Sequence, residues 1–300
     1  MKVFKSIFLV LCFVHACGFA EGEVDFFRAC LNGDAKAFFK LYEKEGKKML
    51  YIRDKEGNTP LHLACCSKKG GNKKELVSFL VEQGANINVQ NGRQSTPLII
   101  AVSNGNIEAT EILLKLKDIK INQATAQGFT PLHIAVINRS IPLIEILLAH
   151  PDINPNFGTT DGATPLHYAA MQEMLEEAKL LIDHPLTNVN APQHDATYSG
   201  ATPLHFAAMQ AQVEIVDYLI KHGAKVSVAI NKGACGGFTP LHFAVLNPDS
   251  VNVFETVKML IRSGANPKTK CHLGKTPTDL TSVEIIQELL KNPKKLFNPG

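Results

Sequence analysis

The sequence predicts an all-α fold in which pairs of helices repeat along the chain as a solenoid. A six-residue block that begins Thr-Pro-Leu-His recurs, and the starting threonines lie 34 to 38 residues apart. A fixed period in that range is typical of repeat proteins, in which each unit packs only against its neighbours. The full block begins at Thr59, Thr130, Thr164, Thr202 and Thr239, and degenerate copies begin at Thr96 and Thr276.

Each block has the composition of a helix N-terminus. Proline after threonine suits the first helical turn, because its missing N–H is not needed there. The threonine hydroxyl can cap the helix that it opens. We therefore expect a short first helix at each block, with its leucine and alanine in the core, followed by a second helix with an apolar stripe.

The loop that precedes each block, here called a finger, carries a glycine two residues before most of the threonines. Glycine permits the positive φ of a tight hairpin tip. Gln94 replaces this glycine before Thr96, so we expect that finger to be distorted. Insertions that lengthen the period are expected at Lys68–Lys74, Ala191–Ser199, Ala229–Gly236 and Asn247–Ser250.

The block and its spacing resemble the ankyrin repeat, whose period is about 33 residues with a T-P-L-H-x-A core. The resemblance implies an all-α ankyrin-repeat solenoid of about eight helix-turn-helix units with β-hairpin finger loops. We expect an N-terminal cap repeat over residues 21–53, six full repeats over residues 54–272, and a C-terminal cap repeat over residues 273–300. Together they form one ankyrin repeat domain, residues 21–300.

Residues 1–20 have a different composition, typical of a secretory signal peptide. Lys2 and Lys5 precede an apolar run, Ile7–Val14, and small residues lead to Ala20. The run is too short to span a bilayer comfortably. Two alternatives stay open: a buried or disordered N-terminal helix, and a lipobox-like segment in which Cys17 is lipidated. We expect export to the periplasm or the cell exterior, with membrane attachment only if Cys17 carries lipid.

Charge gives no indication of a nucleic-acid partner. The net charge is +3, of which the first twenty residues contribute two. Nucleic-acid-binding domains are usually strongly basic. We expect a protein partner, no nucleic acid and no small-molecule substrate, and a monomeric chain.

The repeated histidines and the cysteines are the candidates for metal or redox chemistry. Successive Thr-Pro-Leu-His histidines should lie roughly 10 Å apart in stacked helices, too far for one zinc ion. The resemblance implies a structural role for them, with the imidazole bonded near the turn and its threonine. Cys235 and Cys271 lie in consecutive fingers and could pair if their Cα atoms come close. We expect no cofactor and no metal.

Sequence signatures of catalysis are absent: the chain has no G-x-S-x-G, H-E-x-x-H or P-loop motif. We therefore expect that the protein is not an enzyme. A redox or metal-dependent activity through Cys235 and Cys271 is the alternative of another class.

The resemblance implies that partners bind through the concave face, at finger positions before the threonine and at positions just after the block. Met is common on adaptable binding surfaces. The opposing interpretation is that these side chains pack against neighbouring helices. The candidate residues are Phe129, Ile137, Asn138, Met171, Gln172, Tyr198, Met209, Gln210, Phe238 and Leu246.

The expected function is therefore a non-enzymatic protein-protein interaction scaffold in an exported protein. A secreted effector that engages host proteins fits the same features. So does a structural stabiliser of an enzyme in the cell envelope.

Overall fold

The computed structural model describes residues 21–66, 73–247 and 252–293. Over these residues all regular structure is helical, with sixteen α-helices and no β-strand. Among them, no helix is both long enough and apolar enough to cross a membrane. The chain divides into two compact units, residues 1–153 and 154–300, which we call unit 1 and unit 2.

Unit 1 contains a first helix pair followed by three pairs that each begin with a Thr-Pro block. The first pair packs at the start of the unit, against the next pair along the chain. The helices of unit 1 are α1 (Glu21–Asn32), α2 (Ala35–Glu45), the 3₁₀ helix η2 (Gly46–Leu50), α3 (Pro60–Cys65), α4 (Lys73–Glu82), α5 (Pro97–Ser103), α6 (Ile107–Leu114), α7 (Pro131–Ile137) and α8 (Ile141–Leu148).

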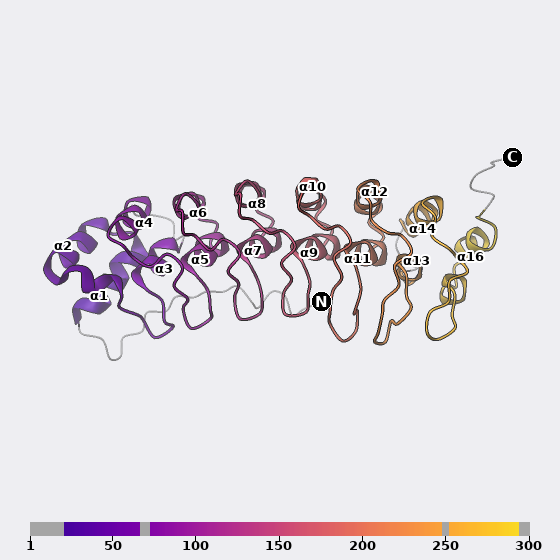
Figure 1. Ribbon diagram of the computed structural model, residues 1–300, viewed down its shortest axis with the longest axis horizontal. Helices are drawn as coiled ribbons and strands as arrows, with labels where there is room; N and C mark the ends of the chain where they lie inside the picture. Colours follow the sequence, from indigo (N-terminus) through magenta and orange to yellow (C-terminus); the bar gives the residue numbers. More distant parts are fainter. Residues whose placement is uncertain (1–20, 67–72, 248–251, 294–300) are drawn as a thin grey trace. The chain divides into compact units, whose positions relative to one another are not determined.

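Unit 2 continues the same pattern. In each unit the first helices of the pairs form one row, the second helices form another, and the fingers lie on the far side of the first row (Figure 1). The helices of unit 2 are α9 (Pro165–Met171), α10 (Leu175–Asp183), α11 (Pro203–Met209), α12 (Val213–Lys221), α13 (Pro240–Ala244), α14 (Val253–Arg262), α15 (Pro277–Leu280) and α16 (Glu284–Lys291).

Local chemistry starts each first helix where the sequence predicts. Thr164 is the N-cap of α9 and Pro165 is its first residue, and the same arrangement recurs at α3, α5, α7, α11, α13 and α15. Leucine, alanine and aromatic side chains of α3, α5, α7, α9, α11 and α13 are buried almost completely. The short helices are therefore held by core packing rather than by their own propensity.

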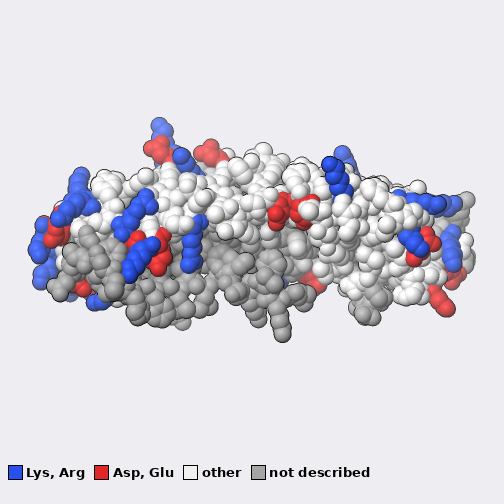
Figure 2. All heavy atoms as spheres, turned by 90° about the horizontal axis from the view of Figure 1, so that it is seen from below, with Lys and Arg blue, Asp and Glu red and all other residues white. Residues whose placement is uncertain are grey.

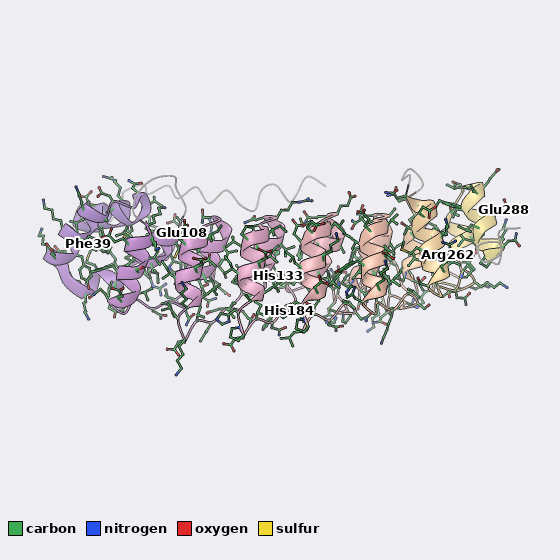
Figure 3. The ribbon with its side chains drawn as sticks, turned by 90° about the horizontal axis from the view of Figure 1, so that it is seen from above. Phe39, Glu108, His133, His184, Arg262 and Glu288 are labelled. Carbon is green, nitrogen blue, oxygen red and sulfur yellow. The ribbon has the colours of Figure 1, made fainter. Side chains whose placement is uncertain are left out.

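The second helices bury one apolar stripe against the first row. Leu181, Leu219 and Leu260 are fully buried at equivalent places on α10, α12 and α14. Seen from above, the second helices of unit 2 lie side by side, and Figure 3 labels Arg262 on α14 and Glu288 on α16.

The fingers close through tight turns, and no β-strand is assigned to them within the described residues. In the first finger Asp54 N–H donates to Asn58 O (3.0 Å) and Gly57 N–H donates to Asp54 O (2.9 Å). These two bonds close a tight loop. Gly57, at φ 77°, sits in the left-handed region that glycine favours.

The expected distortion at Gln94 is wrong. Gln94 takes φ 58° and its N–H donates to Asn91 O at 2.9 Å, as the glycine does in the neighbouring finger. Asn91 holds the loop because its Oδ1 accepts from Arg93 N–H and Ser95 N–H, both at 3.0 Å. The side-chain turn therefore keeps a non-glycine residue in a strained conformation.

Two of the expected insertions lie in the fingers of unit 2, and both add a second turn. Gly200 N–H donates to Gln193 O and Ala201 N–H to Tyr198 O in one, and Phe238 N–H donates to Cys235 O in the next. The other two insertions lie mostly outside the described residues, which omit residues 68–72 of one and 248–250 of the other. The expected signal peptide, residues 1–20 with Cys17, also lies outside them.

Candidate functional site

In unit 2, three of the predicted binding residues lie at the same end of adjacent first helices. Met171 is the last residue of α9, Met209 is the last residue of α11, and Leu246 follows α13. Helix α11 packs against both α9 and α13. Both methionines are half-buried and Leu246 is 44% exposed. The result is a row of partly exposed apolar side chains, one per repeat.

The turn after each helix fixes the direction of these side chains and of the amide beside them. Gln172 and Gln210 are the C-cap residues of α9 and α11. The residues that follow, Glu173 and Ala211, have φ values of 56° and 53°. This left-handed residue returns the chain, and Met174 N–H closes the turn on Ala169 O at 3.1 Å. Each of the two methionines therefore has a glutamine next to it at a defined position.

Unit 1 contains three predicted residues, of which Ile137 and Asn138 take the equivalent positions at the end of a first helix and Phe129 lies in a finger. Ile137 ends α7 and is half-buried, and Asn138 is its exposed C-cap. The Asn138 amide donates to Ser103 O at 3.3 Å, so part of its hydrogen-bonding capacity serves the neighbouring repeat. Phe129 is half-buried in the finger, with its ring edge-on to His133 at 5.9 Å.

The predicted aromatic residues of the unit 2 fingers differ from each other in exposure. The half-buried Tyr198 ring lies 5.6 Å from Phe206 and 6.1 Å from Phe243. Phe238 is only 7% exposed and stacks on the His242 ring at 5.2 Å. Tyr198 can therefore present one edge to a partner, whereas Phe238 packs inside its finger.

Four of the five histidines of the Thr-Pro-Leu-His blocks link one repeat to the next: His62, His167, His205 and His242. The Thr59 N–H donates to His62 Nδ1 at 3.1 Å, and His62 Nε2 lies 3.0 Å from Ser95 O in the next finger. Because Nδ1 is the acceptor, we assign the neutral tautomer with hydrogen on Nε2, which donates to that carbonyl. In unit 2, His205 reaches Val228 O in the same way at 3.0 Å.

Burial keeps these imidazoles neutral. It lowers the pKa of His62 to about 4, although the hydrogen bond to Ser95 O opposes the change. It lowers the pKa of His205 to about 4 as well, and the pKa of His242 in the same direction. A buried neutral imidazole with both nitrogens bonded is a structural element.

The cysteines have the properties of core residues. All five in the described residues are free thiols, Cys235 and Cys271 among them. Burial raises the pKa of Cys65 to about 12 and also raises the pKa of Cys30 and Cys235. Reactive cysteines need the opposite shift, because the thiolate is the nucleophile. Within the described residues, no three metal-ligating side chains come together.

A row of asparagines also links the repeats, and the sequence analysis did not identify it. In unit 1, Asn88 donates to Asp118 O and Asn122 to Asp152 O, both at 2.7 Å. In unit 2, Asn190 donates to Gly223 O at 3.0 Å and accepts from Lys225 N–H at 2.8 Å. An asparagine at the same place in four successive repeats was the available signal.

Known proteins share the repeats of this chain. The family model described as "Ankyrin repeats (3 copies)" matches residues 26–124, 66–159, 152–230 and 186–271. The human transient receptor potential cation channel subfamily A member 1 is 36% identical over 94 residues, which are 31% of this chain and 8% of that protein. The I-Kappa-B like protein N3 of Microplitis demolitor bracovirus is 38% identical over 82 residues, 27% of this chain and 50% of that protein. The matched segment therefore spans half or less of the length of these relatives.

Solved structures share the fold. The ankyrin repeat domain of Bcl-3, of the IkappaB protein family, superposes with a TM-score of 0.67 at 24% identity and covers 79% of this chain and 100% of that one. The human ASB11 ankyrin repeat domain gives 0.58 at 26% identity, covering 78% of this chain and 97% of that one. The chain belongs to the ankyrin repeat family, whose fold typically serves as a non-enzymatic scaffold for protein–protein interaction.

Proposed function

We propose that the protein binds a segment of a partner protein across the row formed by Met171, Met209 and Leu246 in unit 2. The observation that carries this proposal is the repetition itself. Three apolar side chains are partly exposed at the same end of adjacent helices, and Gln172 and Gln210 lie beside two of them. An apolar row with an amide row matches a segment that has one apolar edge and hydrogen-bonding groups next to it.

The free energy gained by burying this row is too small for binding unless residues of the fingers add contact area. If each of the three side chains loses about 60 Å² of exposed apolar area, the gain is about 4.5 kcal/mol. Association costs an estimated 4–15 kcal/mol. The half-buried Tyr198 in a unit 2 finger is an aromatic group that can add contact area, and aromatic residues are frequent hot spots.

The test is a double substitution, Met171→Asp with Met209→Asp. Both side chains are partly exposed, so the substitution should leave the helices folded while it places two carboxylates in the apolar row. We expect loss of the proteins that the wild-type chain captures from its source cells, measured by affinity capture and quantitative mass spectrometry.

The matched control is Ser227→Asp with Ser282→Asp, which adds the same charge at two exposed positions outside the row. The control should capture the same proteins as wild type. Equal capture by the Met171→Asp, Met209→Asp variant, with an unchanged thermal unfolding curve, would refute the proposal.

Export is part of the proposal, on the basis of the composition of residues 1–20. The destination is the periplasm or the cell exterior. An effector that is secreted and engages host proteins is an alternative form of this function that fits the same N-terminal segment and the same repeats. Cell fractionation and the mass of the N-terminal peptide test it: a mature chain that begins at Glu21 supports cleavage. Unaltered detergent partitioning of Cys17→Ser would remove the lipid-anchored alternative.

A further inference from the structure

The charge of unit 2 changes sign along the chain. Residues 154–224 contain eight acidic and two basic side chains, a net −6, whereas residues 225–275 contain seven basic and two acidic ones, a net +5. The near-neutral total of the whole chain hides this asymmetry. Figure 2 looks from the finger side and shows acidic side chains near the start of unit 2, and basic side chains with some acidic ones toward its C-terminal end.

The last two fingers of unit 2, residues 229–237 and 268–275, carry exposed lysines at Lys232, Lys268, Lys270 and Lys275. The two fingers are joined directly. His272 N–H donates to Gly236 O at 3.0 Å, and the His272 ring fills the space that a Cβ on Gly236 would need. We call this pair of fingers the basic finger surface.

One apolar side chain lies within the basic finger surface. Leu273 is 73% exposed, more than any other large hydrophobic residue in the described part of the chain. It sits in the same loop as Lys270 and Lys275. Exposing a leucine this fully at a tip is unfavourable in water, and the surrounding lysines do not cover it.

The carboxylates near the surface are occupied by local bonds. Asp279 Oδ2 accepts from Thr276 N–H and Thr276 Oγ1, both at 2.8 Å. These hydrogen bonds, with smaller contributions from the charges of Lys275 and Lys270, hold the pKa of Asp279 below its usual value. Asp195 accepts from the N–H groups of Thr197 and Tyr198 in its own finger. Lys232, Lys270 and Lys275 form no ion pair with any side chain that the structure describes.

We propose that the basic finger surface binds an acidic stretch of the partner segment, with an apolar partner side chain seated on Leu273. This inference rests on the proposed function and extends it, because it states the chemistry of the partner. The segment lies with its apolar edge on Met209 and Leu246 and continues as an Asp- or Glu-rich stretch over the last two fingers. Complementary charge of this kind sets orientation and association rate.

Charge and shape favour an acidic protein segment over nucleic acid or a membrane. A nucleic acid that followed the fingers would also meet the carboxylates of Asp161 and Asp195, and those repel phosphates. Single-stranded nucleic acid needs exposed aromatic rings for stacking, whereas Phe238 is buried. A short acidic segment with one apolar anchor matches four lysines and one leucine.

The experiment is selection of peptides from a random display library on the immobilised full-length chain. We expect the enriched peptides to combine apolar residues with a cluster of Asp or Glu at one end. Synthetic copies of these peptides are then titrated by fluorescence polarisation against three proteins. The first is wild type. The second, the finger variant, combines Lys232→Gln, Lys270→Gln and Lys275→Gln. The third is a control that combines Lys36→Gln, Lys40→Gln and Lys47→Gln and so removes three exposed charges from unit 1.

We expect the finger variant to bind about tenfold more weakly at low salt, as three exposed ion pairs would predict, and the control to bind as wild type does. The difference should shrink at high salt. Enriched peptides without acidic residues, or equal weakening by both variants, would overturn the inference and leave the apolar row standing. Tighter binding of labelled single-stranded DNA or of phosphatidylglycerol vesicles than of the acidic peptides would also overturn it. If no peptide is enriched, the result counts against the proposed function itself. The same holds if the enriched peptides bind the double variant Met171→Asp with Met209→Asp as tightly as they bind wild type.

Discussion

Acidification should destabilise this fold through its buried histidines as the pH falls below about 6.5. His62 in unit 1 and His205 in unit 2 are almost fully buried, and both have a pKa of about 4 against an ordinary value of 6.5. In the unfolded chain both imidazoles titrate near 6.5. The unfolded state therefore binds more protons than the folded state at every pH between these values, and stability falls as the pH falls through that window.

The magnitude follows from the two pKa values. A shift of about 2.5 units corresponds to about 3.4 kcal/mol for each histidine once the pH is below 4. At pH 5 most of that loss is already present, about 2 kcal/mol for each histidine. Because His62 lies in unit 1 and His205 in unit 2, each unit should lose stability over the same window.

The assay is urea unfolding followed by circular dichroism at pH 8, 7, 6 and 5, for wild type and for His205→Gln. The glutamine variant should be less stable at pH 8, because it loses the bonds to Thr202 and Val228 O. Its stability should fall less between pH 8 and 5 than that of wild type, by about 2 kcal/mol. The control His194→Gln removes an exposed histidine and should keep the wild-type pH dependence.

Identical pH dependence in wild type and His205→Gln would refute this reasoning. It would mean that the imidazole is protonated in the folded protein near its ordinary pKa, and that the hydrogen-bonding pattern assigned to Thr202 N–H and His205 Nδ1 is wrong.

Three further predictions concern the finger turns, the asparagine row and the thiols. Gln94→Gly should raise the free energy of unfolding by about 0.5–1 kcal/mol, because glycine relieves the cost of φ 58° in an exposed turn; thermal unfolding measures it. Asn190→Ala should lower the free energy of unfolding by about 1–2 kcal/mol through the loss of two inter-repeat hydrogen bonds. Asn190→Asp should lower it by less, because the carboxylate can still accept from Lys225 N–H. With iodoacetamide on the native protein, Cys235 should react before Cys30 and Cys65, which are fully buried; peptide mass spectrometry gives the order, and early labelling of Cys65 would contradict the burial.

The helical repeat could be predicted from the sequence because its signals are local. Thr-Pro sets the start of each first helix, and leucine and alanine at fixed spacing set the buried side. α1 ends at Asn32, directly before Gly33 with φ 71°, as the glycine predicts. The final helix, Glu284–Lys291, ends directly before Asn292 and Pro293, because proline cannot continue a helix.

The details that sequence reasoning missed depend on contacts between side chains and backbone. The sequence pattern predicts glycine at the finger tip, but the Asn91 side chain supplies enough hydrogen bonding to hold Gln94 there instead. Position in the repeat suggested that Phe238 is exposed, but the inserted turn folds its ring onto His242. Neither outcome is encoded in a periodicity, because both depend on how one loop closes.

The two polar rows explain why the surface of this fold can specialise. Imidazoles such as His205 and amides such as Asn190 join successive repeats from inside the fingers and from the loops after the second helices. The side chains of Met209, Leu246 and Leu273 take no part in these links. Residues such as Met209, Leu246 and Leu273 are therefore free to be apolar, and Lys270 and Lys275 free to be basic, at little cost to the stack. A charge reversal within one unit of the chain is hard to explain by solubility alone, since mixed charge serves solubility equally well. It is explained if the last fingers were shaped by the charge of what they bind.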